Sequence, residues 1–142
     1  MWPFILTRTV ELEKTIVASK TDVLAILQNP DQLYAQNVMI MSVVQDASDP
    51  SWYTITDRLP LIGSWATHTT VRTQFIKTTD GCDTEVHANL WTRTSGQLRV
   101  RELESSEGTV LLSEKTVVKV HTKGLLLIYL NVHNKFLRDC FF

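Results

Sequence analysis

Three carboxylates stand among apolar residues at the alternating spacing of β-strands. Asp57, Glu102 and Glu114 each share one face of a predicted strand with apolar side chains. These apolar neighbours are Tyr53, Ile55 and Leu59 for the first, Leu98 and Val100 for the second, and Val110, Leu112, Val118 and Val120 for the third. A buried carboxyl group must be paired or neutral, and burial raises its pKa toward the range that suits a general acid or base. All three are therefore candidate catalytic residues.

Two structural explanations compete with catalysis for these carboxylates. A one-residue shift of strand register would turn any of them to solvent, because successive side chains point to opposite faces. Pairing with Arg72, Arg99 or Arg101 would instead make them parts of structural ion pairs. Both explanations remain open at the level of the sequence.

The fourth catalytic candidate, His133, lies on the apolar face of a predicted C-terminal helix. From there it could meet Asp57 or Glu114, and a histidine held by a carboxylate is a natural proton shuttle. The alternative is a core histidine bonded to a backbone carbonyl. Tyr129 comes one helical turn earlier and could donate to a ligand carbonyl, or pack with its hydroxyl at the rim.

The helix that carries His133 is predicted over 124–142. Its apolar face repeats every three or four residues through Leu126, Tyr129, Leu130, His133, Phe136, Leu137 and Cys140. The apolar run 125–130 is too short to cross a bilayer, which needs about 20 residues. The helix must therefore pack on the rest of the chain, and the space beneath it is the expected ligand site. The predicted substrate-binding residues are Tyr53, Tyr129, Trp52, Trp65, Phe136 and Arg72, although ordinary packing also explains the aromatic ones.

Most of the chain before this helix reads as β-structure. Alternating patterns predict strands at about 4–17, 38–46, 52–59, 65–78, 82–94, 97–104 and 109–121. A capping box at Ser19–Asp22 and the pair Asn29-Pro30 predict two short helices after the first strand. Asp80-Gly81, Ser95-Gly96 and Glu107-Gly108 are predicted turns. The chain is thus expected to be a single α+β domain over 1–142.

Composition narrows the classes of function. The 142 residues are 44% hydrophobic and 20% charged, with a formal net charge of −1. This balance does not suggest a nucleic-acid partner, and no basic cluster or signal peptide suggests stable membrane insertion, so a cytoplasmic location is expected. Cys82 and Cys140 form no disulfide framework, and no histidine has metal-ligand spacing. No metal or other cofactor is expected, whereas the apolar ends of the chain allow a homodimer.

The order of elements resembles the helix-grip fold of START domains, plant allergens of the Bet v type and polyketide aromatase/cyclases. That resemblance implies a curved seven-stranded antiparallel sheet wrapped around a long C-terminal helix, with two short helices after the first strand. Residues 52–58, Trp-Tyr-Thr-Ile-Thr-Asp-Arg, are similar to the W-Y-x-I-T-D-R strand of a fungal family of unknown function. The resemblance implies an apolar cavity but carries no catalytic residues.

Two functions fit these observations. The first is a cofactor-independent cyclase, dehydratase or isomerase acting on an apolar polyketide or terpenoid intermediate of fungal secondary metabolism. An enclosing cavity would lower the entropic cost of the reactive conformation, and His133 with Asp57 or Glu114 would move the proton. The alternative is a non-catalytic carrier for a lipid or another hydrophobic small molecule. A partner-binding or dimerising module is a third interpretation.

Overall fold

The computed structural model describes residues 5–60, 66–88, 92–104 and 108–121 of the 142-residue chain. In chain order the elements are β1 (Ile5–Val17), α1 (Lys20–Leu27), α2 (Pro30–Ala35), β2 (Ile40–Gln45), β3 (Trp52–Pro60), β4 (Ala66–Thr78), β5 (Gly81–Ala88), β6 (Thr92–Glu102) and β7 (Thr109–His121). Both short helices and a strand in each predicted region are present, but the strand predicted at 82–94 runs past the end of β5 and includes the start of β6. The helix predicted over 124–142 lies outside the described residues.

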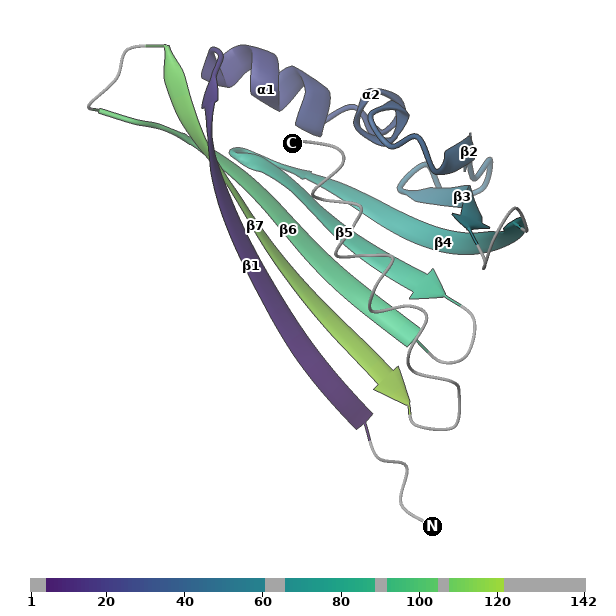
Figure 1. The fold of residues 1–142 in the computed structure, drawn as a ribbon. Coiled ribbons are helices and arrows are strands. Elements are labelled where there is room, and N and C mark those ends of the chain that lie inside the picture. The colour runs from purple at the N-terminus through teal and green to yellow at the C-terminus, as the bar shows by residue number, and fades with distance from the viewer. Residues whose placement is uncertain (1–4, 61–65, 89–91, 105–107, 122–142) are drawn as a thin grey trace.

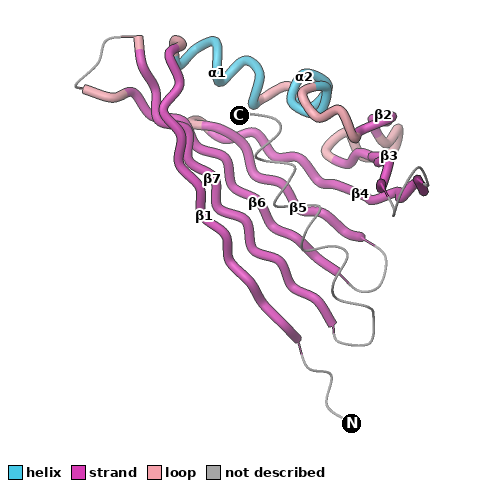
Figure 2. Tube along the Cα trace, viewed as in Figure 1, coloured by secondary structure: helices cyan, strands magenta, loops and turns pink. Residues whose placement is uncertain are grey.

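The strands form one antiparallel sheet in the order β1-β7-β6-β5-β4-β3-β2. Every strand except β1 pairs with its neighbour in sequence, while β1 returns to pair along its full length with β7. The sheet is strongly curved, and α1 and α2 lead from the end of β1 across to β2 at the opposite edge (Figures 1 and 2). The face that these helices cover is called the inner face below, and the opposite face the outer face.

Both helices begin at the caps expected from the sequence. The Ser19 hydroxyl accepts a hydrogen bond from the backbone N–H of Asp22 at 3.1 Å and donates to the Asp22 carboxylate at 2.7 Å. The side-chain oxygen of Asn29 accepts from the backbone N–H of Asp31 at 3.1 Å, ahead of Pro30 at the first turn of α2. These bonds satisfy backbone donors that have no partner within the helix.

The predicted turn at Ser95-Gly96 is wrong. Both residues lie inside β6, and the connection from β5 to β6 falls at 89–91 instead. Gly96 lies directly opposite Thr84, and a Cβ atom added to Gly96 would be 2.6 Å from the Thr84 hydroxyl oxygen. The glycine therefore marks a close approach within a strand rather than a turn.

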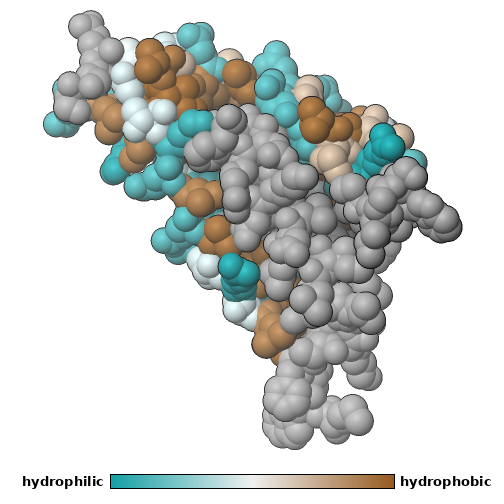
Figure 3. Space-filling model, in the orientation of Figure 1, coloured by the Kyte–Doolittle hydropathy of each residue, from teal (hydrophilic) through white to brown (hydrophobic). Residues whose placement is uncertain are grey.

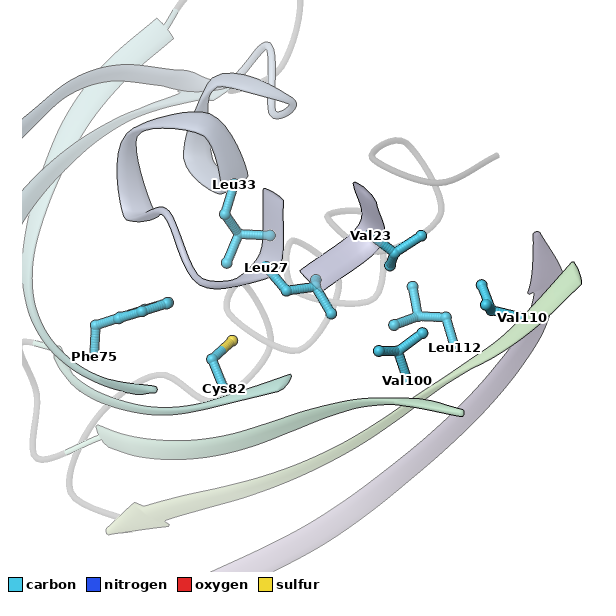
Figure 4. Packing of buried hydrophobic residues seen from close by; sticks show 8 residues of the cluster. All are labelled: Val23, Leu27, Leu33, Phe75, Cys82, Val100, Val110 and Leu112. Atoms are coloured by element: carbon cyan, nitrogen blue, oxygen red, sulfur yellow. The ribbon is translucent and has the colours of Figure 1, made fainter. Parts of the chain in front are cut away.

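The core lies between the two helices and the inner face. Leu27 of α1 and Leu33 of α2 point toward Cys82, Val100 and other residues of the sheet (Figure 4). A second cluster joins Tyr34 of α2 to Ile55 and Val71. Packing on the helices thus fixes which side chain of each strand faces inward, because successive residues alternate between the two faces.

The exposed large apolar side chains belong mainly to the edges of the sheet. They are Ile5, Leu6, Leu12 and Val17 of β1, Met41 and Val44 of β2, Val38 just before β2, and Ile76 of β4. In the view of Figure 3, hydrophobic and hydrophilic residues are interspersed over the described surface. Among the described residues, no helix is long and apolar enough to span a membrane.

Candidate functional site

Asp57 places a carboxyl group on the inner face. It lies on β3 two residues after Ile55, which is only 3% exposed, and directly opposite Thr69 of β4. Its Oδ1 atom is buried and has no hydrogen-bond partner. Burial raises the pKa of Asp57 to about 6. This carboxyl group therefore changes its protonation state close to neutral pH.

Glu114 is the second inner-face carboxyl group. It lies on β7 opposite Leu98 of β6 and Leu12 of β1, as the alternation of apolar residues predicted. Burial raises its pKa to about 7, and the Thr116 hydroxyl, which donates to Oε1 at 2.7 Å, partly offsets that rise. Glu114 thus shares with Asp57 a carboxyl pKa suited to acid–base chemistry.

Two of the three arginines considered as ion-pair partners bind other carboxylates. Arg72 binds Asp46 at 3.0 Å, and Arg99 binds Asp83 at 2.6 Å and Asp80 at 3.4 Å. Within the described part of the chain, no ion pair includes Asp57 or Glu114. Among the described residues, ion pairs therefore do not account for these two half-buried carboxyl groups.

Asp57 and Glu114 do not form a pair with each other. The register places three strands, β4, β5 and β6, between the strands that carry them. Asp57 lies toward the end of β3 that adjoins the start of β4, whereas Glu114 lies in the middle of β7. A reaction that used two acid–base groups would have to pair each of these carboxyls with a different residue.

Tyr34 is a functional candidate that the sequence analysis missed. It is a buried residue of α2, and burial raises its pKa well above the usual range, with further contributions from the nearby Cys82 and Asp57. The Thr73 hydroxyl lies beside that of Tyr34 and slightly offsets the rise, although the Thr73 hydroxyl oxygen makes no aligned hydrogen bond. Tyr34 stays protonated near neutral pH and can donate its hydrogen to a ligand. The signal available in the sequence was the apolar pair Leu33-Tyr34 inside a capped short helix.

Tyr53 lies where the prediction placed it, on the inner face. It is opposite Thr73 and its ring meets that of Phe75 edge-on, with centroids 6.4 Å apart. Cys82 is fully buried on the same face, and burial raises the pKa of its thiol to about 12. The thiol is therefore protonated and is not an activated nucleophile.

Trp52 and Arg72 require a correction, because both lie on the outer face. The Arg72 guanidinium stacks 4.9 Å from the centre of the Trp52 ring, and His87 meets the same ring edge-on at 5.0 Å. Since Tyr53 and Ile55 face inward, alternation along β3 turns Trp52 outward. Neither residue can line a site between the sheet and a helix on the inner face.

The prediction that Glu102 is a buried catalytic candidate is also wrong. It lies opposite Val110 on the inner side of the sheet, as predicted, but at the end of β6, where its side chain is exposed. The carboxylate therefore lacks the burial that motivated its selection. Trp65, Tyr129, His133 and Phe136 lie outside the described residues, and their roles stay predictions.

The described residues hold no group of three or more histidine, cysteine, aspartate or glutamate side chains placed to bind a metal ion. The inner face carries two carboxyl groups, a buried tyrosine hydroxyl and several threonines among apolar side chains.

No protein-family model and no curated sequence matches this chain. Solved structures do match it over almost its whole length. Norcoclaurine synthase from Thalictrum flavum is 11% identical with a TM-score of 0.66, covering 95% of this chain and 82% of the synthase. A START superfamily protein from Mycobacterium smegmatis is 14% identical with a TM-score of 0.63, and the alignment covers 95% of this chain and 90% of the mycobacterial protein.

A third match is the di-domain ARO/CYC StfQ from the steffimycin biosynthetic pathway, at 13% identity and a TM-score of 0.63. The alignment covers 93% of this chain but 48% of StfQ, so this chain spans about half of that protein. The chain has the helix-grip fold. At these identities the likeness concerns the helix-grip architecture alone, and the chemistry of this chain must be argued from its own residues.

Proposed function

We propose that this helix-grip protein is a cofactor-independent enzyme that binds an apolar polyketide or terpenoid intermediate of fungal secondary metabolism on its inner face. It would catalyse a cyclisation, dehydration or isomerisation of that intermediate. The observation that carries the proposal is Asp57, a half-buried carboxyl group with an unpartnered oxygen and a pKa of about 6. A group of this kind is present in both protonation states near neutral pH, as a general acid–base catalyst requires.

The chemistry would begin at a carbon next to a ligand carbonyl group. The Asp57 carboxylate takes a proton from that carbon, and the electron pair of the C–H bond moves toward the carbonyl oxygen. The Tyr34 hydroxyl donates a hydrogen bond to that oxygen and stabilises the developing negative charge. The protonated Asp57 then returns its proton to another carbon in an isomerisation, or to a departing hydroxyl group, which leaves as water, in a dehydration.

The neighbours of this fold support an enclosed ligand without deciding the reaction. One is named a synthase, one a START superfamily protein and one an ARO/CYC from a biosynthetic pathway. The predicted partnership of His133 with Asp57 or Glu114 belongs to the same proposal, as does the fungal origin inferred from residues 52–58.

A non-catalytic carrier of a lipid or other hydrophobic molecule is the second candidate. It is favoured by the separation of Asp57 from Glu114 by three strands, since a carrier needs no converging acid and base. In a carrier, both carboxyl groups would only contribute polarity to the binding site.

The two candidates are separated by what the protein does to its own ligand. Native mass spectrometry of protein purified from its source, followed by extraction, identifies the bound molecule. Its precursor is then incubated with the wild type, Asp57→Asn, Tyr34→Phe and the control Glu104→Gln, which changes an exposed carboxylate. For an enzyme we expect Asp57→Asn to lower turnover at least about 100-fold while binding is retained. An unchanged ligand in every sample would reject the enzyme and favour the carrier.

A further inference from the structure

A row of directly opposed side chains crosses the inner face at the level of Tyr53. Thr73 of β4 lies opposite Tyr53 on one side and Val86 of β5 on the other. Val86 in turn lies opposite Thr94 of β6. The row therefore places two threonines on either side of one valine.

Both threonines are buried with unsatisfied hydroxyl groups. Thr73 is 1% exposed and Thr94 is 3% exposed, and neither hydroxyl oxygen makes an aligned hydrogen bond, although the Tyr34 hydroxyl lies beside that of Thr73. Thr116 is a useful comparison, because it is also buried on the inner face but donates to Glu114. A buried hydroxyl group without a partner destabilises a fold, whereas valine would fill the same space without that cost.

Apolar side chains separate the two hydroxyl groups. Val86 lies between them, and the neighbouring row contains Ile55, Val71 and Ala88. Because adjacent strands lie about 4.8 Å apart, positions two strands apart are separated by roughly 10 Å. Oxygens at the two ends of a flat ring system would reach both threonines while its body rests on Val86.

We infer that the hydroxyl groups of Thr73 and Thr94 bind two oxygen atoms at opposite ends of one fused-ring ligand. This inference rests on the proposed inner-face site and specifies its ligand as a flat apolar compound with hydroxyl or keto groups at both ends. A threonine hydroxyl can donate to a keto oxygen or accept from a hydroxyl group, so both kinds of oxygen fit. The end at Thr73 also lies beside Tyr34, which assigns the reacting carbonyl to that end.

The test uses a series of simple probes, 2,6-dihydroxynaphthalene and 2-naphthol, whose affinities are measured by isothermal titration calorimetry. We expect the diol, with an oxygen at each end, to bind about tenfold more tightly than the mono-alcohol, as one additional hydrogen bond allows. Thr73→Val and Thr94→Val should each abolish that preference. Thr70→Val is the matched control, since it makes the same change on the outer face of β4, and it should leave the preference intact.

Thermal unfolding of the same variants provides a second readout that needs no ligand. Thr73→Val and Thr94→Val should match or exceed the wild-type melting temperature, because each removes an unsatisfied hydroxyl group. Equal affinities for the two probes, no binding of the diol at millimolar concentration, or a lower melting temperature in both variants would overturn the inference. Binding of these probes does not depend on turnover, so a diol preference in a protein that converts no ligand would reject the enzyme and leave this inference standing.

Discussion

At the scale of single residues, one hydrogen bond holds the pKa of Glu114 near neutrality. Burial raises that pKa, and the bond from Thr116 is the interaction that favours the ionised form. Thr116→Val should therefore raise the Glu114 pKa above about 7, because the negative charge loses its donor. Titration of the glutamate side-chain carbons by NMR measures this directly.

Thr70→Val again serves as the control, because Thr70 lies on the outer face and should leave the Glu114 titration unchanged. A fall in the Glu114 pKa in Thr116→Val would mean that the hydroxyl group favours the protonated carboxyl instead.

The sequence predicted which face of the sheet Asp57 and Glu114 occupy, because the alternation of side chains along a strand depends only on the order of neighbouring residues. It did not predict Tyr34, Thr73 or Thr94. The burial of Tyr34 depends on how α2 packs on β3 and β4, and the threonines become neighbours only through pairing of β4, β5 and β6. Threonine is common in β-strands, so the sequence alone does not indicate which threonine hydroxyl groups lack a hydrogen-bond partner.

At the scale of elements, two glycines serve different purposes in the β5–β6 pair. A Cβ atom at Gly81 would clash with the backbone carbonyl oxygen of Leu98, which cannot move without disturbing the sheet. A Cβ atom at Gly96 would instead approach the side-chain oxygen of Thr84. The first contact limits the position of the backbone, and the second limits only a side chain.

Gly81→Ala should accordingly lower the free energy of unfolding by about 2–3 kcal/mol, the upper part of the range for overpacking. Gly96→Ala should cost less, and adding Thr84→Ala should recover most of that loss because the opposing side chain is removed. Urea denaturation of the three proteins measures these differences. Equal costs for the two glycine variants would contradict the distinction between backbone and side-chain contacts.

The same pair of strands shows where prediction of elements failed. Ser95-Gly96 has the composition of a turn, but a glycine is also needed where two strands approach closely. The two uses differ only in what lies opposite the glycine, here Thr84, which is known only after the strands are paired. The turn predicted at Asp80-Gly81 is present within one residue: Thr78 pairs with Gly81, so Thr79 and Asp80 form the turn.

At the scale of the whole molecule, the two inner-face carboxyl groups make stability depend on pH. The folded-state pKa values of Asp57, about 6, and Glu114, about 7, both exceed the unfolded values of 3.8 and 4.5. The folded protein therefore binds more protons than the unfolded chain between these limits. Their contribution to stability is fully present below about pH 4 and is lost as the pH rises through 6 to 7.

We expect the free energy of unfolding to fall by on the order of 2 kcal/mol between pH 5 and pH 8, after discounting for the partial exposure of both groups. The double variant Asp57→Asn/Glu114→Gln should lose most of this dependence, because neither amide titrates. Asp46→Asn is the control: hydrogen bonds from Ser48 hold the Asp46 pKa below its usual value, so its carboxylate is ionised throughout this range. A slope of opposite sign in the wild type would show that the inner-face carboxyls are stabilised in their charged form. It would remove the property on which the proposed acid–base chemistry depends.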